Sequence, residues 1–522
     1  MSKAKKSAVI LMIITLISKL TGFLRDIILA KSFGASIITD AYITALNIPV
    51  VLFTGISASL GTTYIPMFFK IKTEKGQDEV NKFTSNVLNI VIILSILTII
   101  IGSIFTPYIV KIFAMGFKGE ELEITTRFSK ILIISIIFIA TNGLVSSYLL
   151  ANGRFYISGL VTIPFNIICI LAIIIGSFTN SYAMIWITLL AYVAQLLFQI
   201  PFLKKSGYKH KLNVDIKDEN VKNIIYLILP VFLGSYVNQI NSVINRTLAS
   251  TLDTGSITAL NYANKLNIFA VGVLVISIST VMYPMLSKFA SQNNIKAFKW
   301  SLIRCINIVI IVMVPVMIGM IIFSTPTVSF LFEGGSFDAK DTYLTSTSLM
   351  FYSFGMVAFG IRDIVSRGFY SLQDTKTPVK NAMAAVFIDI IFSIILIKKM
   401  GIGGLALSSS ISVIFGAVLL IISLRRKVGR LGIKSSINTF LKTLIASIIM
   451  GVIVKYLYDF IFIIGENFIH KEKYLILIGL IVCSLVGAVI YLILSILLNI
   501  TEIKEGIEQI KNRFVNFIKK AR

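Results

Sequence analysis

TLISKLTGFLRD, residues Thr15–Asp26, is the stretch that decides the fold, because it puts three charges inside an apolar run from about Ser7 to Lys31. On a helix, which turns by about 100° per residue, its polar residues lie within one arc about 120° wide. They are Thr15, Ser18, Lys19, Gly22, Arg25 and Asp26. A charge at the centre of a bilayer costs about 2.5–3.5 kcal/mol, so this arc has to meet partners or line a hydrated cavity. The rest of the chain has to supply that environment.

The composition predicts an all-α polytopic membrane protein. Of the 522 residues, 56% are hydrophobic and only 14% are charged, which is more apolar than a soluble protein of this length needs. The net charge of +25 does not indicate nucleic-acid binding, because the chain has no DNA- or RNA-binding module and its cations lie mostly in short loops. An excess of Lys and Arg is typical of the cytoplasmic loops of membrane proteins. Cys169, Cys305 and Cys483 lie in apolar runs and predict neither a disulfide framework nor a metal site.

Apolar runs of about 20 residues predict about fourteen transmembrane helices. With the N-terminus inside, the inner loops are rich in Lys and Arg, as between Lys204 and Lys211, and the outer loops carry acids such as Glu120. Lys398 and Lys399 are the exception to this alternation. The pattern predicts an even number of spans, with both the N- and C-termini in the cytoplasm.

The polar arc of the first predicted span recurs 220 residues later in the seventh. The matching polar residues are Ser235, Asn238, Gln239, Ser242, Asn245 and Arg246. The recurrence predicts two six-helix lobes related by a parallel repeat, with a central cavity between them. The predicted divisions are a lobe over 1–204, a cytoplasmic loop over 205–222, a lobe over 223–427, two additional helices over 428–500 and an amphipathic cytoplasmic tail over 501–522.

Charges inside predicted spans are the candidate site residues, since they usually mark substrate pathways. They include Lys19, Arg25, Asp26, Asp40, Arg246 and Lys265. Cations outnumber acids in the first span of each lobe, and a guanidinium can hold a phosphate through two parallel hydrogen bonds. The cavity is therefore predicted to take an anionic substrate. Two simpler interpretations stay open: Arg25 and Asp26 neutralise partners in a packed core, and Arg246 reaches the membrane surface.

Signs of catalysis are poor. The chain has no HExxH, GxSxG or P-loop motif and no acidic cluster with metal-ligand spacing. A carrier is therefore favoured over an enzyme.

Several segments resemble the MurJ/MviN lipid II flippases of the multidrug/oligosaccharidyl-lipid/polysaccharide exporter superfamily. They are SKLTGFLRD (18–26), FGASIITDAY (33–42), TTYIPMF (62–68), LSKFA (286–290) and GFYSLQDTKTPVK (368–380). The resemblance implies a flippase of the bacterial plasma membrane that moves undecaprenyl-diphosphate-linked peptidoglycan precursor from the inner to the outer leaflet by alternating access. The diphosphate-sugar head would enter the cationic cavity, and 428–500 would form a groove for the lipid tail. Implied partners are lipid II, membrane lipids and other cell-wall synthesis proteins.

By position, Arg25 and Asp26 match the family's essential Arg-Asp pair, and Lys19 and Lys265 stand at sites often held by Arg. A frequent arginine after the second-span proline is absent, because Pro49 is followed by Val50. Some members resemble sodium-binding carriers. The matching positions are Asn245, Asp389, Ser393 and Ser409, with a single carboxylate among them. Sodium is the one cofactor that the resemblance suggests.

Two alternatives to the lipid II assignment stay open. One is a flippase for another polyprenyl-diphosphate glycan, or a drug exporter of the same superfamily. The other, from a different class, is a membrane enzyme that acts on a polyprenyl-linked precursor.

Overall fold

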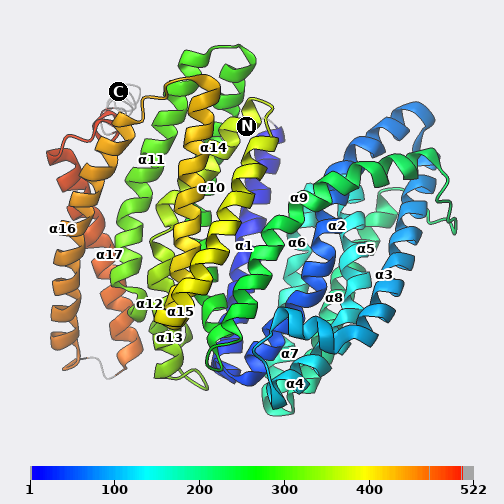
Figure 1. Cartoon of the computed structure of the whole chain (residues 1–522), viewed down its shortest axis with the longest axis horizontal. Coiled ribbons are helices and arrows are strands. Elements are labelled where there is room, and N and C mark those ends of the chain that lie inside the picture. Colours follow the sequence, from blue (N-terminus) through cyan, green and yellow to red (C-terminus); the bar gives the residue numbers. More distant parts are fainter. Residues whose placement is uncertain (1–2, 469–470, 507, 509–522) are drawn as a thin grey trace, which may run out of the picture. The chain divides into compact units, whose positions relative to one another are not determined.

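The computed structural model describes residues 3–468, 471–506 and 508, and within these residues the chain is built from helices joined by short connections (Figure 1). No strand occurs in the described ranges; the only pairing of that kind is an isolated bridge between Gly334 and Phe337. The predicted all-α class is confirmed.

The chain divides into two compact units. Unit 1 consists of Met1–Thr258 and Gly334–Asp341, and unit 2 of Ala259–Glu333 and Thr342–Arg522. The helices of unit 1 are α1 (Lys3–Phe33), α2 (Ile37–Lys75), α3 (Gln77–Phe113), α4 (Gly119–Leu132), the 3-10 turn η1 (Ile133–Ser135), α5 (Ile136–Ala151), α6 (Phe155–Leu160), α7 (Thr162–Phe178), α8 (Ser181–Lys205) and α9 (Glu219–Ala249).

The remaining helices belong to unit 2, except for the first three residues of α10 and the first three of α13, which lie in unit 1. They are α10 (Ser256–Ser291), α11 (Ile295–Ile322), α12 (Ser324–Phe332), α13 (Ala339–Ser353), α14 (Met356–Ser371), α15 (Lys376–Val428), α16 (Lys434–Gly465) and α17 (Glu472–Leu497).

Nine helices among the described residues are long and apolar enough to cross a membrane, or ten if α13 and α14, bent by 47°, form one span. α15 has 53 residues and would be about 80 Å long if straight, more than twice the ~30 Å hydrocarbon core of a bilayer. It is broken at Gly401, where φ is 54° and ψ is −129°. These features are consistent with about fourteen spans, and the exact number stays a prediction.

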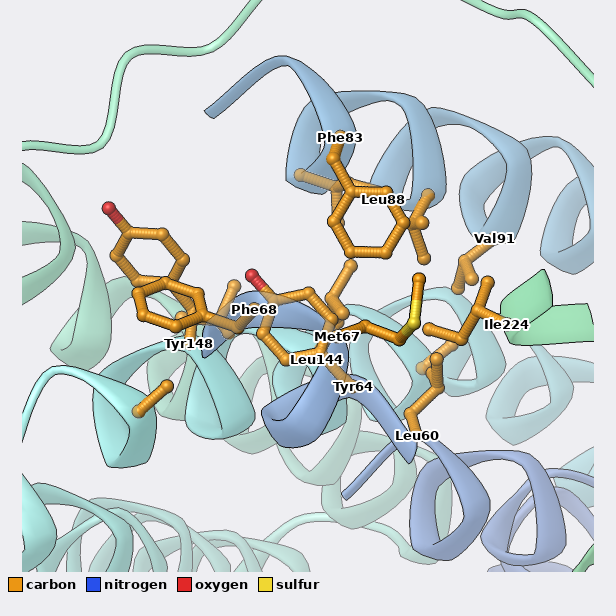
Figure 2. Packing of buried hydrophobic residues seen from close by; sticks show 14 of the residues in the cluster. Leu60, Tyr64, Met67, Phe68, Phe83, Leu88, Val91, Leu144, Tyr148 and Ile224 are labelled. Atoms are coloured by element: carbon orange, nitrogen blue, oxygen red, sulfur yellow. The ribbon is translucent and has the colours of Figure 1, made fainter. Parts of the chain in front are cut away.

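The core of unit 1 includes the predicted TTYIPMF segment. Tyr64 and Phe68 are fully buried, and Figure 2 shows them among side chains of α2, α3 and α5. Tyr64 stacks on Phe83 with ring centroids 5.9 Å apart, and Phe68 meets Tyr148 edge to face at 5.5 Å. Such aromatic pairs add to the stabilisation from burial, so this motif holds unit 1 together.

In unit 2, α11, α14 and α15 share a buried cluster that includes Phe298, Met313, Phe369 and Leu424. α17 is tied to α11 by a hydrogen bond from Tyr491 Oη to the carbonyl oxygen of Ile311, 2.7 Å long. Large apolar side chains on α16 and α17 stay exposed, among them Ile445, Val452, Leu485 and Val489. Such faces suit helices that contact lipid.

Buried asparagines of α3 hold the connection between α8 and α9. Asn81 Nδ2 donates to the carbonyl oxygen of Gly207 at 3.0 Å, and Asn89 Nδ2 to that of Asn213 at 2.9 Å. Asn86 exchanges two hydrogen bonds of 2.8 Å with the backbone of Asp215. The asparagines satisfy backbone groups that have no helical partner, and so they fix the segment 207–215 on unit 1.

The predicted lobes and the two compact units divide the chain in different ways. The first separates the copies of a repeat at 205–222, and the second reflects how the chain packs. The predicted boundaries therefore stay predictions. Of the predicted tail, 507 and 509–522 lie outside the described residues, as do the side chains of Ser235 and Asn238 in the repeated arc.

Candidate functional site

Arg25 and Asp26 of α1 are in contact. Nη2 and Nε of Arg25 both donate to Oδ1 of Asp26, at 3.1 and 3.4 Å. The Asp26 side chain is 6% exposed, whereas that of Arg25 keeps 17% of its surface exposed. The guanidinium carbon also lies 5.9 Å from the ring centroid of Phe165. The pair neutralises itself within the helix but leaves part of the cation accessible.

Asn166 of α7 completes this arrangement, and sequence reasoning missed it. Nη1 of Arg25 donates to Oδ1 of Asn166 at 3.3 Å, while Nδ2 of Asn166 donates to Thr21 Oγ1 at 3.1 Å. Asn166 is 5% exposed. The available signal was a single amide side chain in the apolar run after Pro164. A buried amide needs hydrogen-bond partners, and here its partners are the polar arc of α1.

The rest of that arc has two environments. Ser18 packs toward α6, with Oγ donating to the carbonyl oxygen of Gly159 at 2.7 Å. A Cβ on Gly22 would lie 3.4 Å from Nδ2 of Asn166, so α1 and α7 are in van der Waals contact at this point. Lys19 is exposed. The arc is therefore partly a packing surface and partly open.

Asp40 caps the start of α10. Its carboxylate accepts hydrogen bonds from Gly255 N at 2.7 Å, Thr258 N at 2.8 Å and Thr258 Oγ1 at 2.5 Å. The side chain is buried, with 2% exposed. In this structure Asp40 satisfies the free amides at a helix N-terminus, and its predicted contact with substrate stays a prediction.

The FGAS part of the second recognised segment forms a close backbone contact. Gly34 has a φ of 64°, and a Cβ there would lie 2.3 Å from the carbonyl oxygen of Ser336. Ser336 N donates to the carbonyl oxygen of Lys31 at 2.9 Å, and Ala35 N donates to Asp341 Oδ2 at 2.9 Å. The segment 334–341 therefore packs against the end of α1. This close backbone contact leaves no room for a side chain at position 34, and the positive φ there also favours glycine.

Arg246 of α9 is half-buried, and its Nη1 is buried without a hydrogen-bond acceptor among the described residues. A buried, unsatisfied guanidinium nitrogen is costly and needs an explanation, such as an absent ligand. Lys265 is a half-buried residue of α10 in unit 2. The roles predicted for both cations stay predictions.

The break at Gly401 folds α15 back, so that residues before and after it meet. Ser409 Oγ donates to Asp389 Oδ2 at 3.5 Å, and the hydroxyl oxygens of Ser393 and Ser408 lie 2.6 Å apart. These oxygen donors are of the type that hard cations take. Asn245, the fourth predicted sodium ligand, belongs to unit 1.

A half-buried ion pair lies in unit 2. Asp363 Oδ2 accepts from Arg367 Nε at 2.8 Å and from Ser279 Oγ at 2.6 Å. Arg367 follows Asp363 by one helical turn, so the acid is neutralised within α14. This pair is a packing feature between α10 and α14.

The QDTKTP string has a local structural explanation. Asp374 Oδ1 accepts from Thr377 N at 3.0 Å, capping the first turn of α15, and Asp374 Oδ2 accepts from Lys427 Nζ at 2.6 Å. The hydrogen bond from Lys427 is the main cause that lowers the pKa of Asp374 to about 2. Asp374 thus joins the start of α15 to its end.

The fold and the charges within its helices define a class: a multi-pass helical membrane protein. An inward-facing multidrug resistance MATE family transporter of the MOP superfamily has the same fold, with a TM-score of 0.65 and 17% sequence identity over 80% of this chain and 98% of that one.

The family follows from closer matches. The family model described as lipid II flippase MurJ matches residues 29–474. A probable lipid II flippase MurJ from Buchnera aphidicola subsp. Baizongia pistaciae is 33% identical over 417 residues, covering 78% of this chain and 80% of the relative. A lipid II flippase MurJ structure in an inward closed conformation matches with a TM-score of 0.79 and 28% identity, covering 94% of this chain and 99% of that one. The chain belongs to the MurJ lipid II flippase family.

Proposed function

We propose that this protein moves lipid II, the undecaprenyl-diphosphate-linked peptidoglycan precursor, from the inner to the outer leaflet by alternating access. The observation that carries the proposal is the partly exposed guanidinium of Arg25, held by Asp26 of α1 and Asn166 of α7. A planar guanidinium recognises a diphosphate through parallel hydrogen bonds. Membership of the MurJ family supports the choice of substrate.

Each residue of this site has a distinct proposed role. Arg25 binds the diphosphate, and Asp26 with Asn166 keeps the guanidinium oriented when no substrate is present. Lys19 adds positive charge to α1, the helix that carries Arg25, and its side chain is exposed. Arg246, whose Nη1 has no acceptor among the described residues, and Lys265 are further candidate cations, and Asp40 is a candidate that also caps α10.

No chemical step is part of the proposal, and a reconstitution tests it. Purified full-length protein is placed in liposomes that carry lipid II in one leaflet, and a membrane-impermeant enzyme reports lipid II that reaches the other. We expect transfer above that of protein-free liposomes, with the recovered lipid II chemically intact. Absence of transfer in liposomes with verified incorporation would contradict transport, and modified lipid II would instead support an enzyme.

We also propose that both termini lie in the cytoplasm, with the alternation of Lys and Arg as support. The three native cysteines are buried, so they should add little background to the labelling of an introduced cysteine. A Lys209→Cys variant should react with an impermeant thiol reagent only after the membrane is permeabilised, whereas Glu120→Cys should react in intact cells. Labelling of Lys209→Cys in intact cells would reverse the orientation.

A sodium site is the last part of the proposal. Asp389, Ser393 and Ser409 would supply oxygen ligands across the break in α15, and Asn245 stays the fourth ligand predicted from the sequence. Sodium should then raise the melting temperature of the wild type but not that of Asp389→Ala, with potassium as the control. Melting of the wild type that is indifferent to sodium would remove this site.

A further inference from the structure

A cavity of about 380 Å³ lies in unit 2, away from the residues discussed above. It is formed by one face of α11, the first turns of α16 and the segment that follows α17. Its volume is within the usual range of ligand pockets, about 300–1,000 Å³. The polar residues that matter for its chemistry are Arg304, Asn307, Ser435, Lys442, Glu502 and Glu505.

One wall of the cavity is cationic. The guanidinium carbon of Arg304 lies 5.0 Å from the ring centroid of Trp300, which fixes the plane of the cation. Lys442 faces the same cavity from α16 and donates from Nζ to the carbonyl oxygen of Asn499 at 3.1 Å. Two cations and the hydroxyl of Ser435 are groups that bind a phosphate.

Two acids also line the cavity, and one of them pairs with Arg304. Glu505 Oε2 accepts from Arg304 Nη2 at 2.7 Å, and Glu502 Oε1 accepts from Asn307 Nδ2 at 2.5 Å. Asn307 is only 2% exposed, and its Oδ1 accepts no hydrogen bond within the described part of the chain. A buried acceptor beside a carboxylate calls for a donor, and a positively charged one satisfies both.

The cavity lies where a span meets the membrane surface. Trp300 and Arg304 come within the first three turns of α11, and Lys442 is eight residues from the start of α16. Trp300 is 61% exposed, as expected for a tryptophan at the lipid–water interface. Beside the cavity, Ile437 and Leu441 of α16 are 56% and 52% exposed. Acyl chains of a lipid can therefore lie along α16 while its headgroup enters the cavity.

We propose that this cavity binds a phospholipid whose headgroup joins a phosphate to a primary ammonium, as in phosphatidylethanolamine. The phosphate lies against Arg304 and Lys442, and the ammonium lies against Glu502 and Oδ1 of Asn307. A purely anionic headgroup satisfies only the cationic wall and places its charge near two carboxylates. The site is independent of whether the chain moves lipid II.

The experiment uses Trp300 as the reporter, since the chain has two tryptophans and Trp186→Phe leaves only one. Full-length protein in detergent is titrated with brominated phosphatidylethanolamine or brominated phosphatidylglycerol, which quench tryptophan on contact. We expect saturable quenching, with the ethanolamine lipid binding about tenfold more tightly, the difference that one charge-assisted hydrogen bond makes. Equal binding of the two lipids, or no saturation, would overturn the proposal.

Variants separate the acidic and the cationic residues of the cavity. Glu502→Gln should abolish the preference for the ethanolamine lipid, while Lys442→Ala should weaken both lipids by about tenfold. Lys296→Ala removes an exposed cation of α11 that does not line the cavity; it is the control and should change neither. Each variant is first checked for unchanged melting, and Lys442→Arg, which keeps the charge, should retain binding. Loss of binding in Lys296→Ala equal to that in Lys442→Ala would contradict the site.

Soluble phosphoethanolamine distinguishes a lipid from a free ester. It should displace the brominated lipid only at a concentration far above that of the lipid, because it lacks the acyl chains that contact α16. A saturable change in Trp300 fluorescence on addition of phosphoethanolamine, with no quenching by either brominated lipid, would contradict a lipid occupant.

Discussion

The guanidinium of Arg25 has two different kinds of hydrogen-bond partner. Asp26 supplies charge and is adjacent in sequence, whereas Asn166 supplies a neutral acceptor from a helix 141 residues away. The charged partner offsets the cost of burying the cation. The neutral partner fixes its direction without adding a second negative charge that would compete with an anionic substrate.

Replacement of Asn166 tests this division of roles. Asn166→Leu removes the acceptor for Nη1 and keeps the apolar volume, so the protein should insert normally while Arg25 loses its orientation. Loss of one hydrogen bond to a charged group corresponds to about 1.5–3 kcal/mol, or about ten- to a hundredfold in lipid II affinity. The measurement is lipid II binding to purified protein.

Asn152→Leu is the control for this substitution. Asn152 is an asparagine of the same unit whose Nδ2 donates to the carbonyl oxygen of Tyr148 and which does not contact Arg25 among the hydrogen bonds of the described residues. It should leave lipid II affinity unchanged. Wild-type affinity in Asn166→Leu would show that the amide only packs α1 against α7.

At the scale of elements, special backbone positions connect and divide the long helices. α15 is too long for one span, and Gly401 breaks it with a φ of 54° and a ψ of −129°. The break brings Asp389 and Ser409 together. Asp374, in turn, holds the start of α15 to its end through Lys427. The hairpin formed by α15 therefore depends on one glycine at its bend and one ion pair at its open end.

Gly401→Ala should destabilise the protein, because a side chain disfavours this backbone conformation by about 1–3 kcal/mol. The readout is thermal unfolding in detergent. Gly319→Ala is the matched control, since Gly319 is a helical residue of α11 with open space around it. It should be neutral or slightly stabilising. Equal effects of the two substitutions would contradict a required bend at 401.

The ion pair of Asp374 predicts a dependence of stability on pH. Its pKa is lowered from 3.8 to about 2, so the folded state favours the ionised form. Its stabilisation is complete above pH 3.8 and is lost as the pH falls toward 2. The difference in melting temperature between wild type and Asp374→Asn should be constant above about pH 5 and shrink below about pH 4. A difference that grows on acidification would contradict the pairing.

At the scale of the molecule, apolar runs predicted the helices because each run has to cross a bilayer of fixed thickness. The contact of Arg25 with Asp26 was predictable as well, because the two residues are neighbours on one helix. Asn166 was not, since a single amide in an apolar run has no periodic signal and its partner is distant in sequence. The sequence offered Asp40 as a candidate site residue but could not show that its carboxylate caps a helix that begins 216 residues later. Such long-range pairs depend on packing that periodicity does not encode.

The most direct test of whether lipid II transport requires Arg25 is to measure the amount of lipid II in each leaflet of cells depleted of this protein. Cells are complemented with wild type, Arg25→Ala or Arg25→Lys at equal membrane levels. The account predicts that lipid II collects in the inner leaflet on depletion, that wild type restores it to the outer leaflet, and that Arg25→Ala does not. Arg25→Lys should restore little, since a point charge replaces a planar fork. Normal outer-leaflet lipid II with Arg25→Ala, in a strain without a second flippase, would contradict the account.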